Sequence, residues 1–168
     1  MSGVGRPSPV VEAVDCSELR VAVVAAKWHE QIMDGLIAGA QRAFVDHNVA
    51  APVISRVPGT FELPVVAQAF AQQGFDAVVA LGVVVRGGTP HFEYVCSAAT
   101  DGLSRIALDH HTAIGFGVLT CDTVEQALDR AGLDGSREDK GYEAAAAALE
   151  TAQTLARITR KLKGGLFG

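Results

Sequence analysis

The sequence predicts one α/β domain, a three-layer sandwich in which helices flank a four-stranded parallel sheet. Two observations lead to this fold class. Four short apolar runs alternate with longer segments of helical periodicity, and two such segments follow the fourth run. This alternation is typical of parallel sheets, whose strands are joined by crossover helices. The length of 168 residues also fits a single domain with its own core.

The predicted strands are apolar at most positions, as expected for strands that are buried on both faces of a sheet. They span residues 20–26, 52–57, 76–82 and 113–119. We expect loops at their carboxyl ends, namely residues 27–29, 58–61 and 83–89 after the first three strands. Open α/β sheets bind ligands at this edge, so these loops are candidate site segments.

The segments between the strands place apolar residues three and four positions apart, which predicts amphipathic helices. These helices span residues 30–47, 64–73 and 91–110, a segment capped by residues 120–123 that ends at 131, and 141–161. Asn48 and Gly74 suit the left-handed position that ends a helix, and Pro64 and Pro90 suit a first helical turn. Residues 132–139 form a polar loop.

The two ends of the chain differ from the domain between them. Residues 1–15, which begin with a Gly-, Pro- and Ser-rich stretch, are predicted to form a flexible N-terminal arm able to pair with a neighbouring chain. Residues 16–160 form the single domain, and residues 161–168 form a disordered C-terminal tail.

The composition of the chain indicates which kinds of binding partner and which cellular compartment to expect. Hydrophobic residues make up 49% of the chain, which predicts apolar surface buried between copies. The net charge of −5 argues against nucleic acid and anionic membranes as partners. The sequence holds no membrane-length apolar run and no signal-peptide core. Cys16, Cys96 and Cys121 lack metal-ligand spacing and are interpreted as reduced thiols, which predicts a cytoplasmic protein with no metal.

The strongest functional signal is the segment at residues 80–95, ALGVVVRGGTPHFEYV. Here a strand ends in a Gly-Gly-Thr turn, and a helix begins directly after it. Backbone N–H groups in such a turn can bind an anion. His91 would lie beside that anion as a group able to transfer protons near neutral pH. The alternative is an ordinary strand–helix turn in which His91 is a cap or a surface residue.

The other strand ends also carry unusual residues. Trp28, the only tryptophan, either fills a gap or offers a flat surface for stacking an aromatic heterocycle. Glu62 either caps backbone amides or binds sugar hydroxyls, and the two roles can coexist. Arg130 and Lys140 belong to a charged segment that is either solvated or able to hold phosphate. A site role for these two residues would need a neighbouring subunit or a folded-back helix.

Four motifs, in order and spacing, resemble the 6,7-dimethyl-8-ribityllumazine synthase family. They are PGTFELP, ALGVVVRGGTPHFEYV, GFGVLTCDTVEQALDRAG and EDKGYEAA, and the resemblance covers residues 19–155. It implies a flavodoxin-like fold and a transferase of riboflavin biosynthesis that needs no metal and no cofactor. The implied reaction condenses 5-amino-6-(D-ribitylamino)uracil with 3,4-dihydroxy-2-butanone 4-phosphate to 6,7-dimethyl-8-ribityllumazine, releasing phosphate and water.

The resemblance also implies which residues bind the aminouracil. Trp28 matches the aromatic residue that stacks on the pyrimidine ring, and Lys140 matches a lysine near the ribityl chain. The loop that takes the ribityl chain corresponds to Thr60, Phe61 and Glu62. The backbone stretch that bonds the pyrimidine edge corresponds to Val83, Val84 and Val85.

The remaining matches concern the phosphate and the subunit boundary. Gly88 and Thr89 match the phosphate seat, and His91 matches the proton-transfer residue. Arg130 matches an arginine that meets the phosphate from a neighbouring subunit, and Phe116 matches a position contributed across the same boundary. The resemblance thus implies small-molecule substrates and active sites between subunits.

Family members occur as pentamers, paired pentamers and sixty-subunit shells. The loop at residues 132–139 is longer than the tight turn associated with shells, which favours the isolated pentamer. Two other functions were weighed. One alternative is a non-catalytic carrier that binds flavin or lumazine. Replacement of His91, Arg130 or Lys140 would favour it, but all three residues are present. A flavodoxin-like or signalling domain is disfavoured because a receiver needs acidic residues at the first strand end, where Lys27-Trp28-His29 stands.

Overall fold

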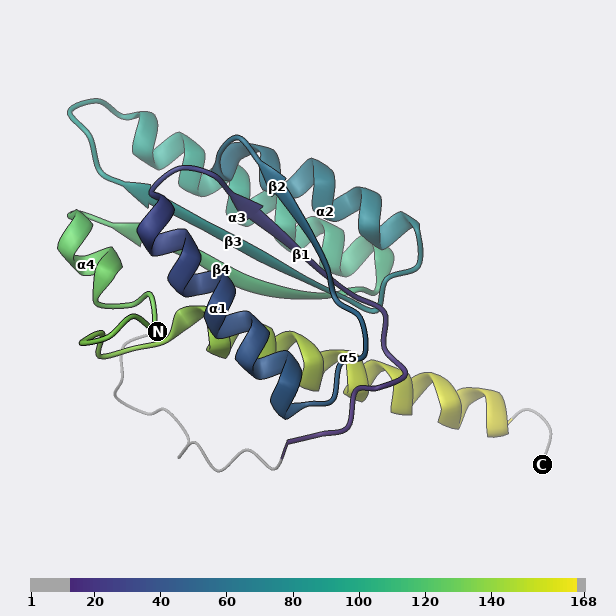
Figure 1. Ribbon diagram of the computed structural model, residues 1–168. Coiled ribbons are helices and arrows are strands. Elements are labelled where there is room, and N and C mark those ends of the chain that lie inside the picture. Colours follow the sequence, from purple (N-terminus) through teal and green to yellow (C-terminus); the bar gives the residue numbers. More distant parts are fainter. Residues whose placement is uncertain (1–12, 166–168) are drawn as a thin grey trace.

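The computed structural model describes residues 13–165 and contains one parallel sheet (Figure 1). The sheet has four strands in the order β2-β1-β3-β4. Their bounds are β1 Val21–Ala26, β2 Val53–Val57, β3 Ala77–Val85 and β4 Ala113–Cys121. All three strand pairs are parallel, so every carboxyl end lies at the same edge.

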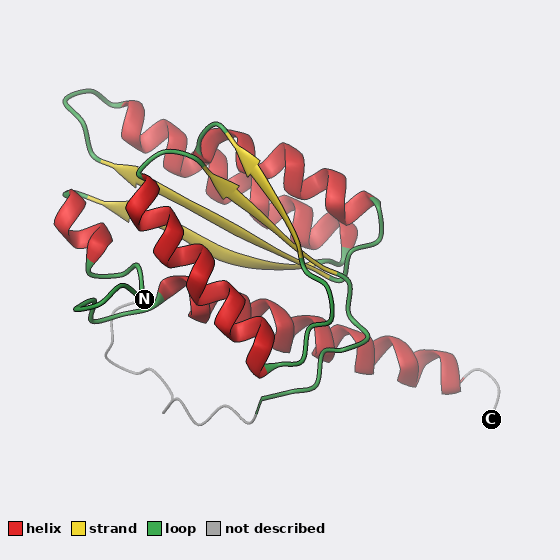
Figure 2. Ribbon diagram, viewed as in Figure 1, coloured by secondary structure: helices red, strands yellow, loops and turns green. Residues whose placement is uncertain are grey.

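Helices cover both faces of the sheet, so the predicted three-layer sandwich is confirmed (Figure 2). One layer holds α1 (Glu30–Asp46), α4 (Val124–Leu128) and α5 (Lys140–Gly165), and the other holds α2 (Leu63–Gln72) and α3 (His91–His110). A short 3₁₀ turn, η1 (Thr60–Glu62), precedes α2. No helix within residues 13–165 is both long and apolar enough to cross a bilayer.

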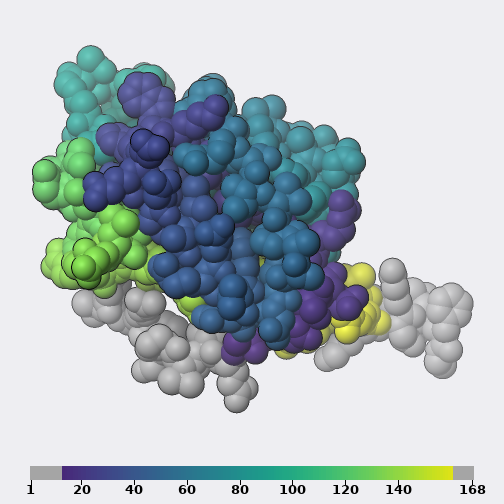
Figure 3. All heavy atoms as spheres, in the orientation of Figure 1, coloured from purple at the N-terminus to yellow at the C-terminus, as the bar shows by residue number. Residues whose placement is uncertain are grey.

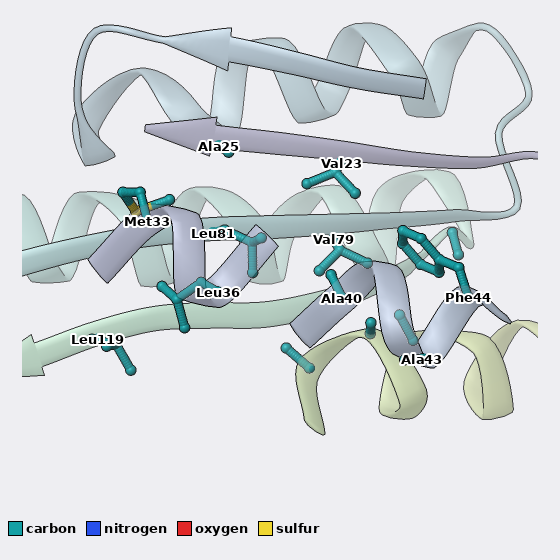
Figure 4. Close-up of a cluster of buried hydrophobic side chains, with 14 of the residues drawn as sticks. Val23, Ala25, Met33, Leu36, Ala40, Ala43, Phe44, Val79, Leu81 and Leu119 are labelled. Atoms are coloured by element: carbon teal, nitrogen blue, oxygen red, sulfur yellow. The ribbon is translucent and has the colours of Figure 1, made fainter. Parts of the chain in front are cut away.

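Alternation along the strands divides the core into two clusters. In β1, Val23 and Ala25 face the layer of α1 and α5, whereas Val24 faces the layer of α2 and α3. Figure 4 shows Met33 and Leu36 of α1 lying over the sheet in the first cluster. The two central strands β1 and β3 are buried on both faces and are apolar throughout, whereas the edge strand β2 is mostly exposed and carries Ser55 and Arg56.

Close packing fixes the start of α5 against α1. A Cβ added at Gly141 would overlap the backbone oxygen of Leu36, so only glycine lets the two helices approach this closely. Asp139 caps α5, because its Oδ1 accepts a 3.0 Å hydrogen bond from the Tyr142 amide. Its Oδ2 lies 2.5 Å from Nη2 of Arg42 on α1. The helix that follows the longest loop is therefore anchored at its first turn.

Two strands end later than the sequence predicts. The third strand was expected to end at residue 82, with a loop from 83 to 89, but β3 continues to Val85. The reason is β4, which pairs with β3 as far as Val85 opposite Cys121. The fourth strand is also two residues longer than the predicted end at 119. Local sequence cannot supply this pairing, because the two partners lie far apart in the chain.

The helix boundaries are closer to expectation. Asn48 and Gly74 have positive φ, as predicted for residues that end helices. Thr123 caps α4 by accepting a hydrogen bond from the Gln126 amide, but α4 ends at Leu128 instead of 131. The last helix runs to Gly165, so residues 161–165 are helical where a disordered tail was predicted. Residues 1–12 of the predicted arm and 166–168 of the tail lie outside the described residues.

Candidate active site

A cleft of about 620 Å³ opens at the carboxyl ends of β1, β2 and β3. The predicted site residues that line it are Trp28, Thr60, Phe61, Glu62, Val83, Val84, Val85 and His91. In the space-filling view, the purple-blue atoms of the β1–α1 segment and the teal atoms of the β3–α3 segment stand at the same end of the molecule (Figure 3). The structure therefore brings together eight residues that come from three separate segments of the chain, one after β1, one after β2 and one from the end of β3 to the start of α3.

Two aromatic side chains project from this edge. Trp28 follows β1 and is 70% exposed, and Phe61 of η1 is 62% exposed. The interpretation of Trp28 as a gap-filling core residue is therefore wrong. The next residue, His29, adopts the left-handed conformation, with φ of 61°, and this turns the chain sharply into α1. Both aromatic faces are open to a planar ligand.

Hydrogen bonds hold η1 against β3 at the base of the cleft. Thr60 is buried, and its hydroxyl donates to the carbonyl oxygen of Val83 at 3.3 Å. Glu62 accepts a 2.9 Å hydrogen bond from the Gly59 amide, so its capping role is confirmed. The carboxylate of Glu62 also lines the cleft, which leaves it available to a ligand's hydroxyl groups. The loop is thus held in place by the same residues that face the cavity.

The backbone of β3 presents N–H and C=O groups that a ligand in the cleft could bind. The ladder between β1 and β3 ends at Leu81, whereas the ladder between β3 and β4 continues to Val85. The Val83 carbonyl points to the cleft side, where Thr60 meets it. Successive residues alternate sides, so the N–H and C=O of Val85 face the cleft with no strand partner among the described residues. Such an edge can pair with the donors and acceptors of a heterocycle.

The β3–α3 turn can bind an anion. No hydrogen bond ties Gly87, Gly88 or Thr89 to the rest of the described chain, and all three residues are exposed. A Cβ added at either glycine would touch nothing within 4 Å. His91 begins α3 directly after this turn and lines the cleft. The free amides and the imidazole are therefore adjacent, as an anion seat with a proton-transfer group requires.

Five predicted site residues do not line the cleft of their own chain: Gly88 and Thr89 belong to the turn before His91, and the other three lie on later elements. Phe116 lies on the edge strand β4 and is 46% exposed. Arg130 follows α4, and its Nη1 donates to the Gln126 carbonyl at 2.8 Å. Lys140, at the start of α5, is mostly buried between the carboxylates of Glu138 and Glu143. None of the three lines the cleft within one chain.

The charges around Lys140 shift its pKa. Burial alone would lower the pKa of Lys140, but hydrogen bonds to Glu138 and Glu143 outweigh burial and raise it. The same pairing lowers the pKa of Glu138. Lys140 is therefore firmly cationic near neutral pH.

Sequence reasoning missed three residues that line the cleft, His29, Gly59 and Val95. His29 and Gly59 directly adjoin predicted site residues, so proximity in sequence was the available signal. Val95 lies four residues after His91 on α3, a spacing that places both side chains on one helix face.

Enzymes built on parallel α/β sheets bind small molecules at the edge where this cleft lies, and its aromatic faces, open backbone edge and imidazole define a site of that class. The model of the 6,7-dimethyl-8-ribityllumazine synthase family matches residues 18–156. The chain belongs to this family.

Similar proteins named 6,7-dimethyl-8-ribityllumazine synthase support the assignment. One from a Nocardioides species is 67% identical over 158 residues, covering 94% of this chain and 97% of the relative. One from Kocuria rhizophila is 63% identical, with 92% and 99% covered. One from Streptomyces avermitilis is 57% identical, with 95% and 98% covered. The resemblance drawn from the four motifs is confirmed.

Proposed function

We propose that this protein is a transferase of riboflavin biosynthesis that condenses 5-amino-6-(D-ribitylamino)uracil with 3,4-dihydroxy-2-butanone 4-phosphate. The products are 6,7-dimethyl-8-ribityllumazine, phosphate and water. The observation that carries this proposal is a single cleft in which an exposed tryptophan, an unpaired strand edge and a histidine converge beside a turn with free amides. Family membership supports the same reaction.

The aminouracil binds in the inner part of the cleft. Its pyrimidine ring stacks on Trp28, and its polar edge pairs with the backbone of Val83, Val84 and Val85. The ribityl hydroxyls bind the loop that contains Thr60, Phe61 and Glu62. The exposed aromatic faces and the open edge of β3 support this arrangement.

The phosphate ester binds at the β3–α3 turn, on the amides of Gly88 and Thr89. There His91 transfers protons as the imine forms and as phosphate leaves, a role typically worth about 10²–10⁴-fold in rate. Holding two reactive molecules face to face supplies much of the remaining acceleration. These steps use the chain's own groups, and we propose that the enzyme needs no metal and no cofactor.

A neighbouring copy of the chain completes the site. Phe116, Arg130 and Lys140 do not reach the cleft of their own chain, and a ring of five subunits would bring them to the next one. Arg130 would then hold the phosphate by its planar fork, and Lys140 would approach the ribityl chain. We propose an isolated pentamer in the cytoplasm instead of paired pentamers or a shell, because the loop at residues 132–139 is long.

The test mixes the purified protein with both substrates and follows lumazine by absorbance. We expect product well above the uncatalysed background. His91→Ala should lower kcat by at least about tenfold, because proton transfer is lost. His110→Ala, at the far end of the same helix, is the matched control and should retain wild-type turnover. No product above background, or tight flavin binding without turnover, would contradict the proposed function.

A further inference from the structure

Arg86 is held by side chains from two other elements at the phosphate end of the cleft. Its Nε donates to Oδ1 of Asp122, directly after β4, at 2.8 Å. Its Nη1 pairs with Glu93 in the first turn of α3, and its guanidinium carbon lies 4.2 Å from the centre of the Phe92 ring. The Arg86 amide donates to the Cys121 carbonyl at 2.9 Å. One residue therefore joins the ends of β3 and β4 to the start of α3.

The turn at residues 87–90 lies between Arg86 and His91. The four residues that separate Arg86 from His91 are all exposed, and the two glycines among them are surrounded by open space. Within residues 13–165, the amides of Gly87, Gly88 and Thr89 bond to nothing. The path of such a turn is set by its two ends, and Arg86 is bonded to both.

Arginine suits this position better than lysine. Its planar fork donates from separate nitrogens to the carboxylates of Asp122 and Glu93 while its face covers Phe92. The hydrogen bonds that Arg86 donates to Asp122 and Glu93 raise the pKa of Arg86, and the bond from Arg86 lowers the pKa of Glu93. Arg86 and Glu93 are therefore both charged near neutral pH. A lysine would keep the charge but could not hold both anchors in one plane.

We propose that Arg86 is a positioning residue for the phosphate-bearing substrate. It fixes the turn at residues 87–90 and the His91 imidazole relative to the end of β3, and it does so without contacting the substrate. This inference rests on the proposed function, which seats the phosphate on that turn.

The experiment compares Arg86→Met, which removes the fork but keeps a long side chain, with Arg86→Lys. The matched control is Arg20→Met. Arg20 also lies over an aromatic ring, 4.4 Å from the centre of Phe75, and donates to the Gln73 carbonyl at 2.7 Å, but at the opposite edge of the sheet. The measurements are kcat, the KM of each substrate, and calorimetric titration with inorganic phosphate.

Arg86→Met should lower kcat/KM for the butanone phosphate by at least about tenfold and weaken phosphate binding by a similar factor. The KM of the aminouracil should stay within about twofold of the wild-type value, because its part of the cleft does not contact Arg86. Arg86→Lys should recover part of the loss, and Arg20→Met should match the wild type. Unchanged phosphate binding, or equal losses for both substrates, would overturn the inference.

Glu93→Gln and Asp122→Asn provide an independent test, because each removes one anchor and keeps Arg86. If these carboxylates acted only as charges, their loss would strengthen phosphate binding by reducing repulsion. Positioning predicts the opposite, a weaker binding of phosphate in both variants. Tighter or equal binding would refute the role of Arg86. Failure of the proposed function would show differently, as an unaltered protein that binds phosphate and forms no lumazine.

Discussion

At the scale of single residues, Glu138 and Lys140 form an ion pair at the start of α5 whose contribution to stability depends on pH. Glu138 is 22% exposed and Lys140 is 18% exposed, so solvent screens this pair less than a surface pair. Their pKa shifts have opposite signs. The stability that the pair contributes therefore has an acidic limit set by Glu138 and an alkaline limit set by Lys140.

Glu138→Gln tests the acidic limit. The pKa of Glu138 is lowered from 4.5, so its contribution is complete above that pH and is lost as pH falls through the folded-state value. We expect the variant to lose about 1 kcal/mol of unfolding free energy at neutral pH. The difference from the wild type should shrink as pH falls below 4.5. Urea denaturation at neutral pH and at a series of acidic pH values measures this. Glu18→Gln, at an exposed carboxylate, is the control, and a difference that persists in acid would contradict the assignment.

The candidate residues that were predictable share a local signal. Trp28 lies in the loop after β1, and His91 begins the helix that follows β3, so the residue type and the position of each are both visible in the sequence. The contact of Arg86 with Asp122 was not predictable, because the pairing of β3 with β4 brings these two residues together. Local sequence indicates residue types at strand ends, but it does not indicate which of them meet.

At the scale of elements, local sequence indicates whether a segment is a strand or a helix, but it does not indicate where the segment ends. Hydrophobic periodicity predicted each of the four strands and the helices between them. The prediction ended the third strand at Gly82, three residues early, although the valines that follow favour a strand. The register of β3 on β4, which is a long-range property, sets the end at Val85.

The packing of α5 on α1 gives a prediction at this scale. Gly141→Ala would ordinarily stabilise a helix by about 0.5–1 kcal/mol. Here the added methyl group overlaps the Leu36 carbonyl, so we expect a loss of at least about 2 kcal/mol in unfolding free energy. Chemical denaturation measures the change.

Gly87→Ala is the control for this substitution, because its Cβ would meet open space. Its unfolding free energy should change by less than about 0.5 kcal/mol. An equally stable Gly141→Ala protein would show that α5 can move away from α1 without cost, contrary to the close packing described here.

At the scale of the whole molecule, one chain leaves apolar side chains in water. Phe116 on the edge strand β4 and Val53 and Ile54 on the edge strand β2 are each more than one third exposed. Leu108 and Tyr94 on α3 are exposed further, at 76% and 74%. Burial of such surface between copies would release the water that covers it, and this favours assembly.

A mixing experiment tests whether two subunits share each site. His91→Ala and Arg130→Ala proteins should each be nearly inactive alone. When they are unfolded together and refolded, about a quarter of the boundaries between subunits in a cyclic ring would join an intact His91 to an intact Arg130. We therefore expect lumazine formation to recover to about that fraction of the wild-type rate. Sedimentation equilibrium checks that the mixed particles have a mass near five chains.

Refolding each variant separately and then mixing the products is the control, and we expect no recovery when activity is measured directly after mixing. Recovery in neither sample would mean that His91 and Arg130 act within the same chain or not together at all. The sequence alone could identify the family through its motifs, but it carries no direct sign of which chain supplies each residue.

The open edge of β3 beyond Leu81 has a consequence for how this enzyme can change over generations. Recognition by main-chain N–H and C=O groups is the same whichever side chains the strand carries. Substitutions at Val84 and Val85 that preserve an extended backbone would therefore leave the proposed pairing with the heterocycle intact, while proline at Val85 would delete a donor outright. Selection can thus vary the hydrophobic lining at these positions without altering the pattern of donors and acceptors that the ring must match.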